Sequence, residues 1–547
     1  MYISYSSRLH RIGQLAASAG LAFALALSTS TPARAQAPAT PLPAAGGRIL
    51  LVLPFDNRTG QPSLEWIREA AAEILTRRFS SAGFAPMSRA DRRYALDHLG
   101  LPQGFHPSRA SSLKLAETVD ADSIIVGSYL TDGTGIVVEA QVVDVPHLRM
   151  SQPVTARGEM RDLIAVFGTL AWKLTRELDP GFSVAQETFV AAGAGLSLAA
   201  FEQYIRGITE PDQQERLRHL NQAVQLNPDF SQAWMALGRE DYDGQKYEDA
   251  AAAFAKVGGG DPDALVAGFY RGLSLMFFGD YATAEEAFGG VARVLPLAEV
   301  VNNQGVALSR QGKDGIPFYR QAVAADPNAA DYHFNLAVSL KRRGESAEAL
   351  AELAQCLRLR PNDTEAQDLN KAWKGLAPPP EPGQEAELKA DPLERISRSF
   401  DAQAFRQAAQ MMDQMEASRL AALTPRDRAQ KLSSQARDYL GRGLLLEAER
   451  LYQAAVAADG KVAAAHAGLA EVRERTGDAQ GARNEAHISI QLAPSAEAYL
   501  VLGRLDLAAG RPDEAGRDAG EAQKLEPQSP AAQDLRRQIE AKQGQKQ

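Results

Sequence analysis

Cysteine is almost absent from this chain, which has one, Cys356, among 547 residues. A single cysteine excludes an internal disulfide and any zinc site built on paired cysteines. Cys356 falls in a helical repeat, at a position that normally takes a small buried residue, and a free cysteine behaves as a small hydrophobe. We therefore expect it to pack in a core rather than to perform redox chemistry.

Sequence motifs of active sites are missing as well. The eight histidines are scattered, and neither a His-Glu-x-x-His nor a Gly-x-Ser-x-Gly sequence occurs. The glycines at 258–260 lack the following Lys-Ser/Thr of a phosphate-binding loop, and those at 193 and 195 lack the third glycine of a dinucleotide fingerprint. His333 and His466 occupy equivalent repeat positions, which helix packing explains more simply than metal ligation. The sequence predicts a non-enzymatic protein with no cofactor.

Neither sign of charge dominates. Lys and Arg number 59 and Asp and Glu 68, well mixed along the chain, for a formal net charge of −9. A nucleic-acid-binding protein would instead show a basic stripe, so no nucleic-acid partner is expected.

The amino terminus carries an apolar run, Leu15–Leu27, that is shorter than the ~20 residues needed to span a bilayer as a helix. Two arginines precede it, and Ala33-Arg34-Ala35 follows it as a small-x-small cleavage site. We expect residues 1–35 to be a cleaved signal peptide and residues 36–47 a linker. The mature chain is then predicted to be periplasmic, with no stable membrane insertion.

The most informative feature present is a period. Prolines recur after 34, 34, 31 and 34 residues, as Pro228, Pro262, Pro296, Pro327 and Pro361. A fixed period in this range is typical of a helical solenoid, in which each unit buries its apolar face against its neighbours.

One unit shows the pattern most clearly. Small residues let two helices approach closely, aromatic residues fill the space between them, and a proline ends the second helix. In this unit these residues are Trp234, Leu237, Gly238, Tyr247, Ala250, Phe254 and Pro262. They resemble the tetratricopeptide (TPR) pattern W-x2-L-G-x2-Y, A-x3-F, P. The resemblance implies paired helices that bind proteins or peptides.

The same offsets divide the rest of the chain. We predict a first TPR array over residues 195–375, with about five repeats and a following helix, and a second over 428–545, with three repeats and a capping helix. A proline-rich spacer separates them at 376–390. Residues 391–424, which include Met411 and Met415, are expected to form a long helix that packs back on a repeat array or, alternatively, offers a binding face.

Residues 48–180 have a different pattern. A continuous apolar run at 49–53 indicates a strand buried on both faces, and residues 123–130 and 138–142 read as a hairpin, followed by a return strand near Val154 and a helix. The segments V-L-P-F-D-N-R-T-G and A-D-S-I-I-V-G-S-Y-L resemble the amino-terminal domain of the Tol-Pal protein TolB, which implies a docking or sensing domain in the cell envelope. The fold class expected is thus a small α/β domain followed by two all-α TPR solenoids.

TPR arrays usually bind partners in a concave groove lined by the first helix of each repeat. Asn303 and Asn335 occupy equivalent positions there, where an amide can pair with a peptide backbone. Aromatic residues beside cations favour an extended peptide with acidic groups. The candidate peptide-binding residues are Arg239, Tyr242, Phe269, Asn303, Arg310, Phe334, Asn335, Lys341 and Arg342. Surface solvation and hydrogen bonding within a repeat are the alternative explanation for the two amides.

Two functions remain open from the sequence. The first is an exported, non-catalytic scaffold that joins protein partners through the TPR grooves and the α/β domain. The second is a sensory protein whose α/β domain binds a small ligand while the repeats relay its occupancy.

Overall fold

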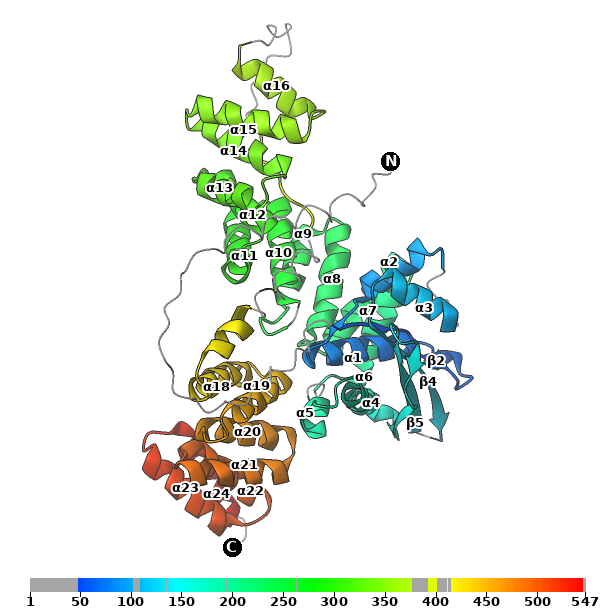
Figure 1. Cartoon of the computed structure of the whole chain (residues 1–547), viewed down its shortest axis with the longest axis vertical. Helices are drawn as coiled ribbons and strands as arrows, with labels where there is room; N and C mark the ends of the chain where they lie inside the picture. Colours follow the sequence, from blue (N-terminus) through cyan, green and yellow to red (C-terminus); the bar gives the residue numbers. More distant parts are fainter. Residues whose placement is uncertain are drawn as a thin grey trace, which may run out of the picture. The chain divides into compact units, whose positions relative to one another are not determined.

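The computed structural model describes residues 48–101, 109–133, 135–191, 195–261, 263–375, 392–400, 411 and 415–544 (Figure 1). The predicted signal peptide, the linker at 36–47 and the spacer at 376–390 lie outside the described residues, as does Pro262.

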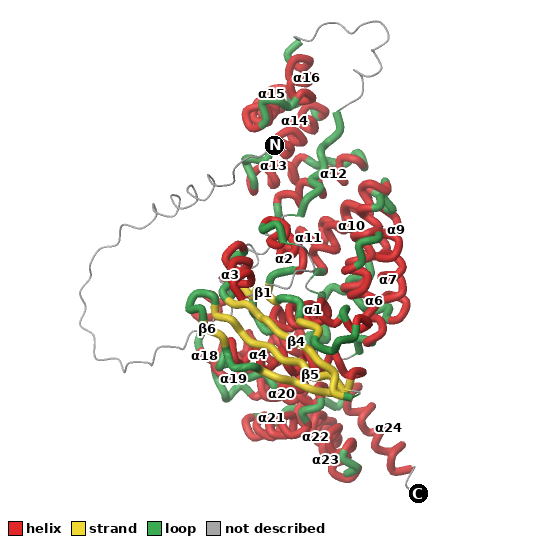
Figure 2. Tube along the Cα trace, turned by 90° about the vertical axis from the view of Figure 1, so that its right-hand side faces the viewer, coloured by secondary structure: helices red, strands yellow, loops and turns green. Residues whose placement is uncertain are grey.

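The amino-terminal part of the described chain is built on one mixed, seven-stranded sheet. Strand β1 (Ile49–Val52) pairs in parallel with β3 (Ala85–Pro86), and β7 (Val154–Glu159) returns along β5 (Gly135–Asp144). Strand β4 (Ser123–Asp132) lies between β1 and β5, parallel to β1 and in a long antiparallel hairpin with β5 (Figure 2). The remaining strands are β2 (Asp56–Asn57) and β6 (Arg149–Met150).

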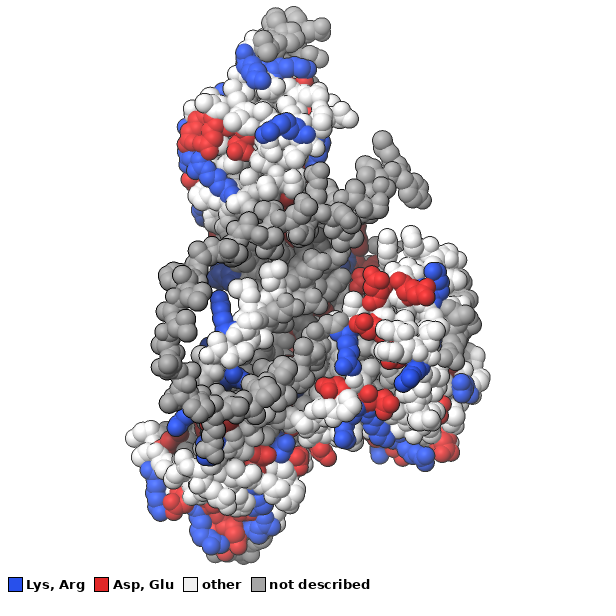
Figure 3. Space-filling model, in the orientation of Figure 1, with Lys and Arg blue, Asp and Glu red and all other residues white. Residues whose placement is uncertain are grey.

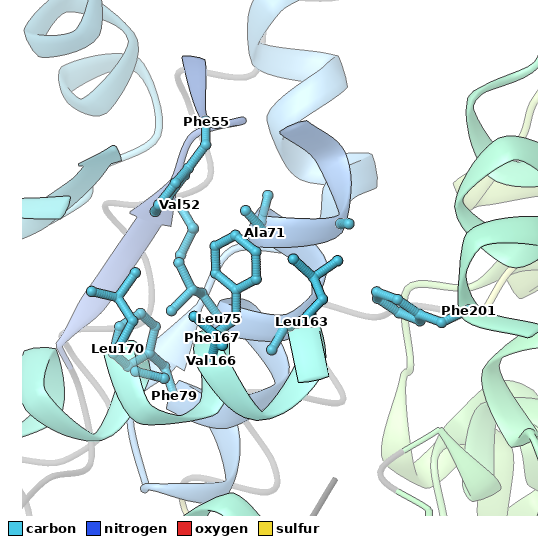
Figure 4. Packing of buried hydrophobic residues seen from close by; sticks show 14 of the residues in the cluster. Val52, Phe55, Ala71, Leu75, Phe79, Leu163, Val166, Phe167, Leu170 and Phe201 are labelled. Atoms are coloured by element: carbon cyan, nitrogen blue, oxygen red, sulfur yellow. The ribbon is translucent and has the colours of Figure 1, made fainter. Parts of the chain in front are cut away.

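Helices pack on both faces of this sheet. Successive side chains of a strand point to opposite faces, so Val52 joins one hydrophobic cluster and Leu51 another. The first cluster contains side chains of α1 (Ile67–Ser81) and α4 (Leu163–Leu178), which meet around Phe55 and Phe167 (Figure 4). The second contains side chains of α2 (Arg89–His98) and α3 (Arg109–Thr118). The predicted α/β domain is confirmed.

The rest of the described chain is helical, and successive helices form pairs joined by short turns. In the first array the pairs are α6 (Leu198–Thr209) with α7 (Gln213–Leu226), α8 (Ser231–Asp243) with α9 (Tyr247–Phe254), α10 (Ala264–Phe278) with α11 (Tyr281–Val294), α12 (Ala298–Arg310) with α13 (Ile316–Ala325), and α14 (Ala330–Arg342) with α15 (Ser346–Leu359), followed by α16 (Thr364–Trp373). In the second they are α18 (Pro425–Gly441) with α19 (Leu445–Ala458), α20 (Ala463–Thr476) with α21 (Ala479–Leu492), and α22 (Ala496–Ala508) with α23 (Pro512–Leu525), followed by α24 (Pro530–Gly544).

Glycines explain how closely these paired helices approach. A Cβ added at Gly272 would lie 2.6 Å from the ring of Phe288 on the paired helix. At Gly238 it would lie 2.8 Å from Phe254. The aromatic ring of the second helix therefore occupies the space that any side chain on the first would need, as the repeat pattern predicts.

One predicted element is wrong in part. The sequence predicts a helix through 391–424, but residues 392–400 have no helical structure, whereas residues 415–422 are helical. The reason is tertiary: backbone groups of residues 392–400 that a helix would pair internally are instead bonded to side chains of the first array. This segment lies at the centre of the candidate site.

The described helices and the charged surface can both be compared with what a membrane span or a one-sign charged face would require. Among the described helices, none has the length and apolar composition to cross a bilayer. On the face shown in Figure 3, acidic and basic side chains are interspersed in the described regions.

Candidate functional site

An extended segment of the chain, residues 392–400, lies against the first helices of the first array. We call it the internal segment. Its contacts come from α10, α12 and α14, and from the start of α16. The internal segment runs opposite to the order of the repeats, because Arg395 contacts α14, Ser397 contacts α12 and Phe400 contacts α10.

Two asparagines hold the backbone of the internal segment. Asn335 donates to the carbonyl oxygen of Arg395 at 2.8 Å and accepts from its N–H at 2.6 Å. Asn303 makes the same pair of bonds with Ser397, both at 2.8 Å. Each amide thus satisfies one donor and one acceptor of the peptide, a pairing that is independent of the peptide's side chains.

The spacing of the asparagines suits an extended chain. Arg395 and Ser397 are two residues apart, which is about 7 Å in a strand, and alternate residues present their backbone groups to the same side. The axes of packed helices lie about 8–10 Å apart. Consecutive first helices can therefore each hold every second residue of an extended peptide.

A third asparagine completes the network. Asn302 accepts a hydrogen bond from Asn335 at 2.8 Å and donates to the carbonyl oxygen of Arg395 at 3.2 Å. All three asparagines are fully buried when the internal segment is in place. Because unpaired buried amides are costly, the groove needs a peptide backbone or water at these positions.

A cationic subsite receives Glu394. Arg310 donates to the main-chain carbonyl oxygen of Glu394 at 3.0 Å, and its guanidinium lies 3.7 Å from the carboxylate. Arg342 pairs directly with the same carboxylate. The Glu394 side chain is only 1% exposed, so its charge is compensated by these two arginines rather than by water.

An anionic subsite lies beside it and receives Arg395. The guanidinium donates to Asp331 at 2.9 Å, to Asp363 at 2.5 Å and to Glu365 at 2.8 Å, and it lies 3.6 Å from the ring centroid of Phe334. Such a planar cation over an aromatic face, bonded by several carboxylates, is a contact that arginine makes and lysine does not reproduce.

The ion pairs of this subsite raise the pKa of its arginine and lower the pKa of Asp363. Burial lowers the pKa of Arg395, but its hydrogen bonds to the three carboxylates outweigh burial and raise it overall. The hydrogen bond from Arg395 is the main cause that lowers the pKa of Asp363. The ion pairs therefore persist at neutral pH.

The far end of the internal segment is apolar. Phe400 lies 5.2 Å from Phe269 between ring centroids, and Ile396 packs against the same hydrophobic cluster. Arg398 is exposed but places its guanidinium 5.0 Å from the ring centroid of Phe277. The groove thus binds charged side chains at one end of the segment and apolar side chains at the other.

Six of the predicted site residues meet in this groove: Phe269, Asn303, Arg310, Phe334, Asn335 and Arg342. What they contact is the chain's own internal segment, so binding of a separate partner stays a prediction.

The other three predicted residues make contacts within the array. Arg239 lies 4.9 Å from the ring centroid of Tyr270, and Tyr242 packs among aromatic rings. Lys341 bonds to Ser346 at 3.1 Å and lies 5.7 Å from the ring centroid of Trp373.

Sequence reasoning missed the acidic half of the groove. The pattern of cations, aromatics and amides at groove positions does not include Asp331, Asp363 or Glu365. Asp363 also caps α16 by accepting a hydrogen bond from the N–H of Ala366 at 3.1 Å. Because this capping role explains the aspartate locally, the sequence gives no sign that it also binds Arg395. The expectation of an extended peptide with acidic groups is therefore incomplete, since the groove also binds a cation.

Two other predictions concern residues outside the groove. Cys356 is fully buried, and burial raises the pKa of its thiol to about 11. His333 and His466 sit in matching networks, each with one ring nitrogen 2.6 Å from a glutamate and the other 3.1 Å from a main-chain carbonyl oxygen. Both histidines therefore pack between helices in the same way.

Comparison with known protein families gives matches in both helical arrays. Two family models, each described as tetratricopeptide repeat, match residues 318–351 and 434–497. The chain is a tetratricopeptide repeat protein. No curated protein gives a significant match to this TPR protein.

Solved structures similar to this TPR protein share little sequence with it. MamA from Desulfovibrio magneticus RS-1 is 21% identical with a TM-score of 0.28, covering 31% of this chain and 100% of that one. YrrB, described as a TPR protein with an unusual peptide-binding site, is 16% identical with a TM-score of 0.28, covering 37% and 98%. The LpoB carboxy-terminal domain from Salmonella enterica is 22% identical with a TM-score of 0.19, covering 21% and 84%.

Proposed function

We propose that this protein is an exported, non-catalytic scaffold of the bacterial cell envelope that binds extended peptide segments of its partners in the groove of the first TPR array. TPR proteins generally bind protein or peptide partners. The observation that carries the proposal is the paired hydrogen bonding of Asn303 and Asn335 to alternate residues of an extended backbone.

The geometry of the groove supports binding of a peptide rather than catalysis of a reaction on it. The groove holds a backbone by side-chain amides and compensates charges of both signs. Such an arrangement fixes a peptide without activating any of its bonds. The burial and raised pKa of the Cys356 thiol also weigh against its use as a nucleophile.

The envelope assignment is supported by the sequence of residues 1–35. The α/β domain is proposed to dock to a second partner, as its resemblance to the TolB amino-terminal domain implies. The two binding regions would then let one chain hold two partners together.

Site-specific photocrosslinking in living cells tests the groove. A benzophenone amino acid replaces Phe277, a partly buried ring beside Arg398, and in a matched control replaces the adjacent Phe278, which is 51% exposed. We expect position 277 to yield a crosslinked partner, mapped to an extended segment of that protein, and position 278 to yield much less of it.

Substitution of both asparagines then checks the chemistry. The Asn303→Ala/Asn335→Ala variant, carrying the probe at 277, should lose most of this crosslink while it keeps its helical circular dichroism. Equal crosslinking at both positions, or a crosslink unaffected by the double substitution, would show that the groove is not the binding surface.

A further inference from the structure

The internal segment defines which peptides the groove selects. We infer that the groove is a selective site for an extended peptide with an adjacent Glu-Arg pair, and that residues 392–400 occupy it as a built-in competitor that a partner must displace. This inference rests on the proposed function of the groove and names the ligand and the regulation of that site.

The order of the two charges carries the selectivity. Glu394 enters a subsite of two arginines, and Arg395 enters one of three carboxylates. A peptide with the order reversed would place like charges together in both subsites while one of them is nearly closed to water. Like-charge contacts and uncompensated buried charges both oppose binding strongly.

Occupancy by the internal segment blocks the groove for other peptides. The backbone-bonding groups of Asn303 and Asn335 are already used, since each amide both donates to and accepts from the segment. Both charged subsites are also filled. A second peptide can make the same contacts only after the internal segment has left.

The connection to the groove is short enough for binding within one chain. Residue 375 ends the described part of the first array, and residues 376–391 precede the internal segment. Sixteen residues can extend to roughly 50 Å, which permits return to the same array, and a tether of this length gives an effective concentration of about millimolar. An internal segment with an intrinsic dissociation constant of about 1 μM then weakens the binding of a separate peptide by about a thousandfold.

Peptide binding to the full mature chain tests both parts. The probe is a fluorescent synthetic peptide of the sequence PLERISRSF, residues 392–400, and its control is PLREISRSF, with the same composition and net charge. The protein is compared with the Glu394→Ala/Arg395→Ala variant, which removes the two charges that enter the charged subsites but leaves every groove residue unchanged.

We expect the double variant to bind PLERISRSF at least tenfold more tightly than the unmodified chain does, and to bind PLREISRSF at least tenfold more weakly than PLERISRSF. A Leu393→Ala variant is the matched control, because Leu393 belongs to the internal segment but is 58% exposed. It should bind the probe like the unmodified chain. Adding Asn335→Ala to the double variant should remove probe binding.

Three results would overturn the inference. Equal affinity for the two peptides would exclude selection of the Glu-Arg order. Equal probe affinity of the unmodified chain and the double variant would exclude competition by the internal segment. A concentration-dependent dimer in sedimentation, lost in the double variant, would mean that the segment occupies the groove of a second copy instead of its own.

Failure of the inference is separable from failure of the proposed function. If crosslinking through position 277 still depends on Asn303 and Asn335 while the peptide experiment fails, the groove binds partners of other sequence. If both experiments fail, the groove has no partner-binding role.

Discussion

Side-chain amides carry the recognition at the residue scale. Asn303 and Asn335 each bond to one residue of the internal segment through both a donor and an acceptor. An aspartate there could accept from the peptide N–H but could not donate to its carbonyl oxygen. Asparagine is therefore the residue type that matches a backbone amide at both of its polar groups, and charge selectivity is left to the neighbouring side chains.

A second residue-scale feature is the pair formed by His466 and Glu485. The hydrogen bond that His466 donates to Glu485 raises the pKa of His466 above its ordinary 6.5, and burial opposes this only in part. The folded state thus favours imidazolium, so the pair's stabilisation is fully present below pH 6.5 and is lost as the pH rises through the raised pKa.

Glu485→Gln is therefore expected to lower the melting temperature more at pH 5.5 than at pH 9, because the lost stabilisation depends on a protonated His466. Melting curves at the two pH values measure this difference. Glu485 also accepts from Arg473 at 3.1 Å, and loss of that bond adds a pH-independent decrease. The exposed Glu540→Gln serves as control. An effect of Glu485→Gln that is the same at both pH values would mean that His466 is not charged in the folded protein.

Close helix pairing is the main feature at the scale of the element. Gly272, Gly238 and Gly305 each face an aromatic ring of the paired helix within 2.8 Å of a would-be Cβ. In contrast, Gly516 in α23 has no heavy atom within 4 Å of that position. The first three glycines are therefore required for close packing of the paired helices, whereas position 516 has space for a side chain.

Alanine substitution separates these two classes. Gly272→Ala should destabilise the array by ~1–3 kcal/mol, because the ring of Phe288 must move in a packed interface. Gly516→Ala should stabilise α23 by ~0.5–1 kcal/mol, because alanine favours a helix over glycine. Thermal unfolding followed by circular dichroism measures both. If both variants shift the midpoint upward, the ring of Phe288 does not restrict the side chain at position 272.

The elements show which parts of the structure the sequence can predict. The helix pairs follow from the period of the prolines and from glycine and aromatic residues at fixed offsets, all of which are local patterns. The strand at 49–52 follows from an apolar run. The sequence predicts a helix for the internal segment, because its partners Asn303 and Asn335 lie 94 and 60 residues away from the residues they bind. No local pattern contains that information.

The sequence likewise predicts only those features of the groove that follow from local patterns. The repeat register alone identifies first-helix positions with amides, cations and aromatics. That the ligand comes from the chain itself, and that Asp331 and Asp363 bind its arginine, depends on the three-dimensional path of residues 392–400.

At the scale of the whole molecule, a folded sheet domain precedes a long helical repeat region, and binding is proposed for both. With its groove occupied by the internal segment, the chain is inferred to bind only a partner that carries the matching Glu-Arg order and is abundant enough to displace that segment.

Export is the remaining whole-molecule prediction. Residues 1–35 combine a basic start, an apolar run and the Ala33-Arg34-Ala35 site, so amino-terminal sequencing of the protein from cells should find Gln36 as the first residue. Ala33→Arg should block cleavage, because the small-x-small pattern requires a small side chain there, and the uncleaved form should stay with the membrane fraction through its apolar run. Arg34→Lys, at the unrestricted middle position, is the matched control and should be processed normally. A mature protein that retains Met1 in the soluble fraction would contradict export and, with it, the proposal that the partners of the groove lie in the envelope.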